Sequence, residues 1–335
     1  MPSRSLSPTD RPLSRRLMLG AAVSLAATPC VHGPAFAGTR DVTLVVSYPE
    51  GGGADLMART IAPRLGEALG QRVVVENQSG ASGQVAAARV ARATPDGTTL
   101  LLDASSFAVN PSLYPRMAYD SDRAFVPLAV LATFPNVLVC FPGDTARTVQ
   151  DVIQLARSRP ASVAYTSSGN GSAQHLAGAL FEQRAGVQLV HRPQAGGGPA
   201  LNEVMAGRVP LFFANLASSL VHIQAGRLRA LAVTAPVRAR PLSHVPTMAE
   251  VGVDHFEVME WNPVLAPQGM SADTRGRLVA AIGTALADVE VLARIRALGG
   301  NVFPDPSQES AGKFIQAQRA FWTKVVRERR IAIAN

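Results

Sequence analysis

Gly51, Gly52 and Gly53 stand where the chain could hold an anion. A short apolar run at residues 42–48 precedes them, and apolar residues at helical spacing follow them. Glycine lets the backbone approach a ligand closely, and the first amide groups of a helix carry partial positive charge without a partner inside the helix. Such a turn is suited to binding an anion, although a tight connection without a ligand explains a single glycine-rich turn equally well.

Four further turns offer similar chemistry. The turns at residues 77–83 and 194–198 are glycine-rich, the turn at 166–172 is rich in hydroxyl groups, and the turn at 103–106 includes Ser105. Each follows an apolar run that is typical of a strand. Because ligands of open α/β sheets bind beyond the carboxyl ends of the strands, we expect the turns at 48–55, 77–83 and 103–106 to face one common spot.

Catalytic and metal chemistry is poorly supported. Ser167 or Ser168 with His175 could be offered as nucleophile and base, but the turn lacks a Gly-x-Ser-x-Gly elbow and no motif supplies an orienting acid. Helix capping or ligand contact is the more usual role of serine in such a turn. The remaining histidines have no metal-ligand spacing, and the glycine turns lack the continuation of a nucleotide site. We therefore expect no enzyme, no metal and no cofactor.

The elements that position these turns alternate between strand and helix. Apolar runs without alternation predict strands buried on both faces, and hence a parallel sheet covered by helices on both sides. One series ends near residue 141 and a second runs to about 262. Two long helices follow, at about 271–298 and 308–329, and we expect both to pack on the first sheet. The sequence therefore predicts an α/β protein with a discontinuous first lobe, residues 38–141 with 263–335, a second lobe at 142–262, and a hinge between them.

The N-terminus predicts export. Arg15 and Arg16 precede an apolar run at residues 17–27, and Ala35 and Ala37 form an A-x-A cleavage site, so residues 1–37 are expected to be a cleaved signal peptide. The run is too short for a membrane anchor, which needs about 20 apolar residues. The twin arginines resemble a Tat signal, but Sec signals also carry arginines, and both routes stay open. Periplasmic localisation follows.

Composition narrows the remaining classes. The chain has 335 residues, 47% of them hydrophobic, and a formal net charge of +8. Its basic residues are scattered, which argues against a nucleic-acid surface. Of the two cysteines, Cys140 alone would remain after cleavage, within an apolar run where a buried thiol is expected. What remains is a cleft lined by amides, hydroxyls and carboxamides, which is typical of a carrier that closes over a small anion.

The turns and their spacing resemble the substrate-binding proteins of tripartite tricarboxylate transporters, also called the Bug family. The resemblance rests on Tyr-Pro-Glu-Gly-Gly-Gly-Ala-Asp at residues 48–55 and on residues 76–83, 95–97, 165–176, 196–200 and 226–234, and it extends from about Val42 to Ala332. It implies a type II periplasmic binding protein fold with Venus-flytrap closure. It also implies a carboxylate ligand, handover to a membrane transporter, and a protein that we expect to be monomeric.

Carried over to this chain, the family's carboxylate clamp falls on two turns of the first lobe, whose amides would hold one carboxylate directly or through water. The second lobe would contribute hydroxyl, carboxamide and backbone groups. Asp55, in the first helical turn, could instead be a helix cap. With Ser105 from the third turn, the expected ligand-binding residues are Tyr48, Glu50, Gly51, Gly52, Gly53, Asp55, Asn77, Gly80, Ala81, Ser82, Gly83, Ser105, Ser167, Ser168, Asn170, Ala195, Gly196 and Asn215.

Two positions depart from the family pattern. Glu50 stands where a small residue or proline is usual, and its carboxylate would repel an anion unless it faces solvent or pairs with an amino group, so amino acids become candidate ligands. Ala214 stands where an aspartate is common, which removes a polar partner from the second lobe. A receptor that feeds a signalling system is an alternative function, and an enzyme acting on a carboxylate in the same cleft is another.

Overall fold

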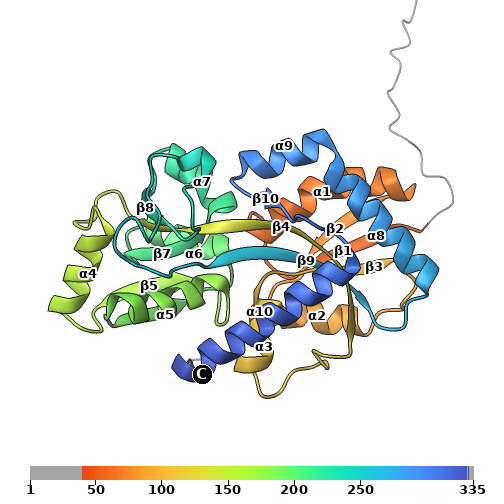
Figure 1. Ribbon diagram of the computed structural model, residues 1–335, viewed down its shortest axis with the longest axis horizontal. Helices are drawn as coiled ribbons and strands as arrows, with labels where there is room; N and C mark the ends of the chain where they lie inside the picture. The colour runs from red at the N-terminus through yellow and green to blue at the C-terminus, as the bar shows by residue number, and fades with distance from the viewer. Residues whose placement is uncertain (1–39, 330, 332–335) are drawn as a thin grey trace, which may run out of the picture. The chain divides into compact units, whose positions relative to one another are not determined.

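The computed structural model describes residues 40–329 and residue 331, so the predicted signal peptide lies outside the described residues. Strands and helices alternate along most of this range (Figure 1). The strands are β1 Val42–Val46, β2 Val73–Asn77, β3 Thr99–Leu102, β4 Phe125–Cys140, β5 Val163–Ser167, β6 Leu189–Pro193, β7 Leu211–Asn215, β8 Arg229–Val233, β9 Met259–Pro267 and β10 Asn301–Val302. The helices are α1 Gly53–Leu69, α2 Gln84–Ala91, α3 Ser106–Leu113, α4 Val149–Ser158, α5 Ala173–Ala185, α6 Gly197–Met205, α7 Leu216–Gln224, α8 Ala272–Ala287, α9 Val289–Ala297 and α10 Gln308–Arg329, with 3-10 turns η1 Ala81–Gly83 and η2 Arg240–Leu242.

The first group of strands is parallel at its outer end and antiparallel at its inner end. β1 pairs in parallel with β2 and β3, with Thr43 opposite Val74 and Thr99. β9 then pairs antiparallel with β3, and β4 pairs antiparallel with β9. The expectation of a fully parallel sheet is therefore wrong for β4 and β9. A strand must be reached through a crossover connection, usually a helix, to lie parallel to its neighbour. β4 and β9 instead run directly from one group of strands to the other, so they can pair antiparallel with their neighbours.

The second group of strands repeats the pattern. β5 pairs in parallel with β6 and β7, while β4 pairs antiparallel with β7 and β8. The 16-residue strand β4 thus belongs to both groups, and Figure 1 shows it running beside β9 through the middle of the fold. Two α/β halves are thus joined through the long strands β4 and β9. The lobe bounds at residues 141–142 and 262–263 stay a prediction.

The apolar cores follow the two groups of strands. Leu44, Val46 and Leu100 pack with α1 and α8, whereas Tyr165, Phe181 and Phe213 pack with α4 and α5. The buried thiol of Cys140 lies in the second of these cores, as expected for an apolar strand residue. None of the helices in the described range is both long enough and apolar enough to cross a bilayer.

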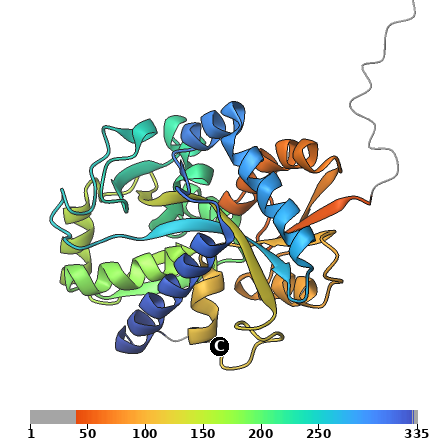
Figure 2. The same ribbon diagram turned by 45° about the vertical axis from the view of Figure 1, so that its right-hand side comes forward.

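The last helices differ from the expectation in two ways. The helical segment expected at 271–298 is two helices, because Asp288 ends α8 and caps α9 by accepting hydrogen bonds from two backbone N–H groups. α10 does not pack on the first sheet alone. Its Ile315 joins the core around Trp261, whereas Trp322 joins the core of the second group. Figure 2 shows α10, in dark blue, running beside α3. One long helix therefore buries apolar surface against both halves.

Candidate ligand-binding site

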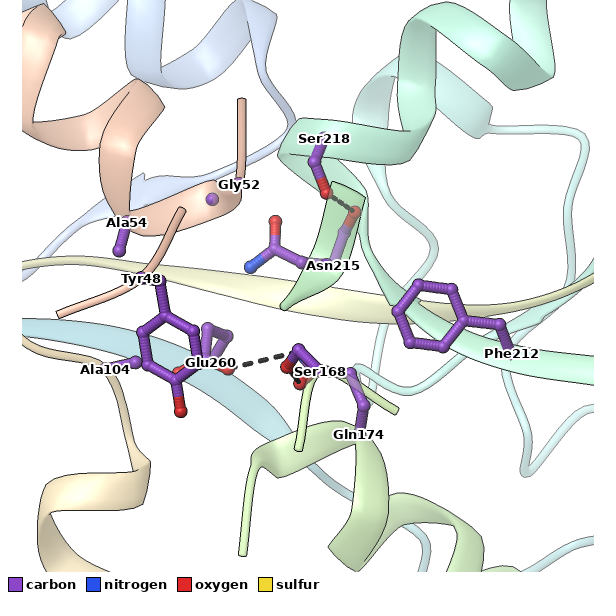
Figure 3. Close-up of a pocket in the computed structure, with 12 residues that line it drawn as sticks. Tyr48, Gly52, Ala54, Ala104, Ser168, Gln174, Phe212, Asn215, Ser218 and Glu260 are labelled. Carbon is purple, nitrogen blue, oxygen red and sulfur yellow. Dashed lines mark hydrogen bonds between the residues drawn. The ribbon is translucent and has the colours of Figure 1, made fainter. Parts of the chain in front are cut away.

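Helix N-termini from both halves meet around two adjoining cavities, which share Tyr48 and Ser168 in their linings. The first cavity has a volume of about 30 Å³ and is lined by Tyr48, Gly52, Gly53, Ala54, Ala104, Ser168, Gln174, Gly197, Phe212, Asn215, Ser218 and Glu260 (Figure 3). The second cavity has a volume of about 220 Å³ and is lined by Ser47, Tyr48, Ser79, Gly80, Ala81, Ser82, Gly83, Tyr114, Ser168, Gly169, Asn170, Pro193, Gln194 and Ala195.

The N-terminus of α1 forms one wall of the first cavity. Gly52 is the N-cap, and Gly53 and Ala54 are the first helical residues. Their amide groups have no partner within the helix, because the first four N–H groups of any helix have none. The helix dipole adds positive potential at the same place. This wall can therefore donate hydrogen bonds to an anion without using a charged side chain.

Asp55 and Asn77 stabilise the glycine turn and line neither cavity. Asp55 is 2% exposed, and its carboxylate accepts hydrogen bonds from the Gly51 N–H at 2.9 Å and from Asn77 Nδ2 at 3.0 Å. Asn77 Nδ2 also donates to the Tyr48 carbonyl at 2.9 Å. These two residues therefore position the α1 N-terminus, whose cap is Gly52.

Glu50 points away from both cavities. Its side chain is 77% exposed and accepts a hydrogen bond from Arg59 Nη2 at 3.1 Å. An exposed ion pair of this kind contributes little energy, and solvent screens its charge. The side chain faces solvent, which is one of the two conditions under which it would not repel an anion, so its presence gives no reason to favour an amino acid as ligand.

Replacing Glu50 with glutamine is therefore expected to change ligand affinity by less than about twofold, because a screened surface charge has little effect on a buried site. Isothermal titration of both proteins with the same carboxylate measures this. A much larger gain in affinity for anions would mean that Glu50 faces the ligand.

The turn between β2 and α2 forms one wall of the second cavity. Four consecutive residues, Gly80, Ala81, Ser82 and Gly83, have positive φ angles. A Cβ on Gly83 would lie 2.8 Å from Asp103 Oδ1, so glycine is required for the turn to pack against β3. Ser82 Oγ donates a hydrogen bond to the Asn170 carbonyl of the other half. The two halves are therefore in direct contact at this cavity.

Asn215 and Ser168 form the facing wall of the first cavity. Asn215 caps α7, because its Oδ1 accepts the Ala217 N–H at 2.9 Å. No acceptor for its Nδ2 is found among the described residues, and Figure 3 shows this amide pointing toward Ala54 and Tyr48. The same amide lies so close to Gly53 that a Cβ there would be 2.7 Å from Nδ2. Asn215 is therefore a hydrogen-bond donor facing the α1 N-terminus.

Ser167 lines neither cavity and instead contacts a buried histidine. It is buried, and its hydroxyl lies 2.7 Å from His191 Nε2. The His191 ring stacks on His175 with centroids 4.0 Å apart. Burial lowers the pKa of His175 to about 4 and that of His191 to about 3, so both rings are neutral at neutral pH. No acid orients either histidine among their described contacts, which argues against the serine–histidine enzyme alternative.

The structure brings eleven of the eighteen expected residues into the linings: Tyr48, Gly52, Gly53, Gly80, Ala81, Ser82, Gly83, Ser168, Asn170, Ala195 and Asn215. The other seven support them from behind or lie outside: Glu50, Gly51, Asp55, Asn77, Ser105, Ser167 and Gly196. Gly196 packs on Pro49, where a Cβ would lie 2.6 Å from Pro49 Cγ. Sequence reasoning missed Gln174, Phe212, Ser218, Tyr114 and Glu260. Of these, Gln174 and Ser218 could have been found from the sequence, because each lies in the first turn of a predicted helix.

Two buried acids lie beside the first cavity. Burial raises the pKa of Asp103 to about 7 and also raises the pKa of Glu260. Asp103 accepts a hydrogen bond from Ser47 Oγ, and Glu260 accepts the Ser105 N–H at 2.7 Å. In the described range no lysine, arginine or histidine lines either cavity, and no cluster of residues could hold a metal ion. The donors for an anion are therefore neutral groups.

Asp103 makes folding stability depend on pH. Its pKa is about 7 in the folded protein and near the ordinary 3.8 in the unfolded chain, so between these values the folded state binds a proton that the unfolded state has released. Its contribution to stability therefore falls as pH rises through this window. Asp103→Asn removes the contribution, so the melting temperature of the variant minus that of the parent should increase from about pH 4 to about pH 7. The contributions of the buried histidines cancel in this difference, and a pH-independent difference would contradict the assignment.

Comparison with known proteins identifies the family. The model of the tripartite tricarboxylate transporter family receptor, TctC, matches residues 57–331. Protein BugT of Bordetella pertussis is 35% identical over 308 residues, covering 90% of this chain and 94% of its own. An R. palustris protein solved with adipate is 36% identical with a TM-score of 0.85, and MatC from Rhodopseudomonas palustris with bound malate is 29% identical with a TM-score of 0.81. These structures cover 88% and 86% of this chain and 99% of their own.

The resemblance seen in the motifs is thereby confirmed, and so is the periplasmic binding protein fold. The family is one of solute receptors, which agrees with the expectation that the chain is not an enzyme. The chain belongs to the tripartite tricarboxylate transporter receptor family, also called the TctC or Bug family.

Proposed function

We propose that this receptor captures a small organic carboxylate between its two halves and delivers it to the membrane components of a tripartite tricarboxylate transporter. The observation that carries the proposal is the convergence of four helix N-termini, those of α1, α5, α6 and α7, on a cavity without a basic side chain in the described residues. Their dipoles and free amide groups together favour an anion. The relatives solved with adipate and malate support the same ligand class.

The same geometry supports a proposal for the ligand-binding residues. The carboxylate would accept hydrogen bonds from the amides of Gly53 and Ala54 and from Asn215 Nδ2, all of which line the first cavity or face it. The rest of the ligand would occupy the second cavity, whose volume of about 220 Å³ suits a small molecule. Tyr48 and Ser168 lie where the two parts of the ligand would join, because both residues line both cavities.

Closure of the two halves over the ligand is part of the proposal. Three contacts support it: Ser82 with Asn170, Pro49 with Gly196, and Gly53 with Asn215. Each joins a turn of the first half to a turn of the second. Opening would separate these contacts and bend the strands that connect the halves, while the cores of the two halves stay packed.

Transport is proposed to begin in the periplasm. Residues 1–37 have the features of an export signal, and the protein would work there as a monomer that presents its closed form to the membrane transporter. A metal or cofactor is not needed for this function, because neutral donors and helix dipoles are sufficient to bind a carboxylate.

Thermal-shift and calorimetric titration of residues 38–335 test the proposal. A panel of mono- and dicarboxylates, each matched by its neutral amide, should give at least one acid that raises the melting temperature in proportion to its concentration, while its amide does not. The ligand should be recovered unchanged after prolonged incubation. Binding of the amide as tightly as the acid, or conversion of the ligand, would contradict the proposal.

A further inference from the structure

Glu260 is an unusual residue for a site that binds anions. It lies in β9, is 5% exposed and lines the first cavity. Among the side chains that the structure describes in the two linings, it is the one with a formal charge. A carboxylate here opposes an anionic ligand unless the part of the ligand beside it carries hydrogen-bond donors. The position of Glu260 therefore indicates which chemical groups the ligand carries beside it.

Glu260 accepts hydrogen bonds from three N–H donors. Oε1 accepts the Ser105 N–H at 2.7 Å and the Trp261 N–H at 3.3 Å, and Oε2 accepts Gln174 Nε2 at 3.2 Å. A carboxylate offers about four acceptor positions, so these three bonds leave acceptor capacity on Oε2. All three partners favour the acceptor form of the side chain. Glu260 therefore presents an oxygen acceptor to the cavity.

A series of side-chain hydrogen bonds also makes Ser168 an acceptor toward the cavity. Asn136 Nδ2 donates to the Val258 carbonyl, which leaves Asn136 Oδ1 to accept from Gln174 Nε2 at 3.1 Å. The oxygen of that Gln174 amide then accepts the Ser168 hydroxyl proton. Because its only proton is used in this bond, Ser168 Oγ can offer only lone pairs to the cavity. Figure 3 shows Ser168, Gln174 and Glu260 gathered on one side of the cavity.

One wall of the first cavity therefore offers hydrogen-bond donors and the other offers acceptors. The α1 N-terminus and Asn215 Nδ2 offer donors, while Ser168 Oγ and Glu260 Oε2 offer acceptors. A plain carboxylate satisfies the donors but leaves the acceptors without a partner. A buried polar group that loses water without gaining a partner weakens binding.

We propose that Glu260 and Ser168 form a specificity pocket for a hydrogen-bond donor, a hydroxyl or an ammonium group, carried by the ligand close to its carboxylate. This inference rests on the proposed function and narrows it to substituted carboxylates, such as hydroxy acids or amino acids. Glu260 acts on the donor group directly, and Gln174 acts as a positioning residue that fixes the acceptor direction of Ser168.

Titration calorimetry with matched ligands tests the inference. Succinate, malate and aspartate share one carbon skeleton and differ in a hydrogen, a hydroxyl and an ammonium group, and glutarate, 2-hydroxyglutarate and glutamate form a second such series. Within a series, the hydroxyl or the ammonium member should bind more tightly than the unsubstituted acid by about tenfold or more, since a site built for a donor rejects the analogue that lacks it. The member that binds more tightly identifies the donor.

Glu260→Gln should reduce this ratio toward one, and Ser168→Ala should reduce it independently. The matched control is Glu257→Gln, which removes the same charge from an exposed position three residues away and should leave the ratio unchanged. A merely structural role of Glu260 would weaken all members of a series together. An equal ratio in the parent and in Glu260→Gln would overturn the inference, as would tightest binding of the unsubstituted acid. Failure of every carboxylate to bind would contradict the proposed function instead.

Discussion

Replacing Gly53 with valine is expected to weaken carboxylate binding by about tenfold or more, which corresponds to at least about 1.4 kcal/mol. A Cβ at this position would lie 2.7 Å from Asn215 Nδ2, and a valine side chain would fill the space between the α1 N-terminus and the facing wall. The added methyl groups both displace the ligand and hold the two halves apart. Calorimetric titration with a carboxylate that binds the parent measures the change.

Stability without ligand should change little in Gly53→Val, because residue 53 lies outside the apolar core and separation of the two halves relieves its contact with Asn215. The control is Gly276→Val in α8, an exposed position where a Cβ meets nothing within 4 Å. Unaltered affinity in Gly53→Val, or an equal loss in Gly276→Val, would contradict the placement of the ligand at α1.

Replacing Asn215 with aspartate is expected to have a larger effect, a loss of about a hundredfold in carboxylate affinity, or about 3 kcal/mol. The substitution keeps the oxygen that caps α7 but replaces the Nδ2 donor with a negatively charged oxygen. The ligand loses one hydrogen bond and gains a like charge at close range in a poorly solvated site.

Aspartate is as good an N-cap as asparagine, and its charge favours the helix N-terminus, so the melting temperature without ligand should be retained. Asn202→Asp is the matched control, since it adds the same charge at an exposed position of α6. A carboxylate affinity that survives Asn215→Asp would mean that the amide does not contact the ligand.

Much of the site could be predicted from sequence, because backbone geometry leaves a local signal. The turn at 80–83 needs positive φ angles, and the two glycines within it indicate this requirement in the sequence. Turns that lead from a strand into a helix are also local, and the structure places Gly52, Ser168 and Asn215 between a strand and the helix that follows it or at their junction. Local chemistry of this kind does not depend on the tertiary arrangement.

Glu260 could not be predicted in this way. It lies inside strand β9, where apolar neighbours on both sides suggest only burial, and its place in the cavity depends on β9 pairing with β3 and β4. The same non-local pairing made β4 and β9 antiparallel, against expectation. α10 packs against both cores. Its amphipathic pattern predicts an apolar face but does not indicate which cores that face contacts. Glu50 was misleading because its ion-pair partner, Arg59, lies nine residues further along the chain and comes close only when α1 forms.

We expect backbone amides at a helix N-terminus, and not charged side chains, to hold the carboxylate. A crystal structure of residues 38–335 with the tightest-binding carboxylate tests it most directly. A carboxylate oxygen is expected about 3 Å from the amide nitrogen of Gly53 or Ala54, with Asn215 Nδ2 as a further donor. A carboxylate held instead by an arginine or lysine side chain, away from the α1 N-terminus, would contradict it.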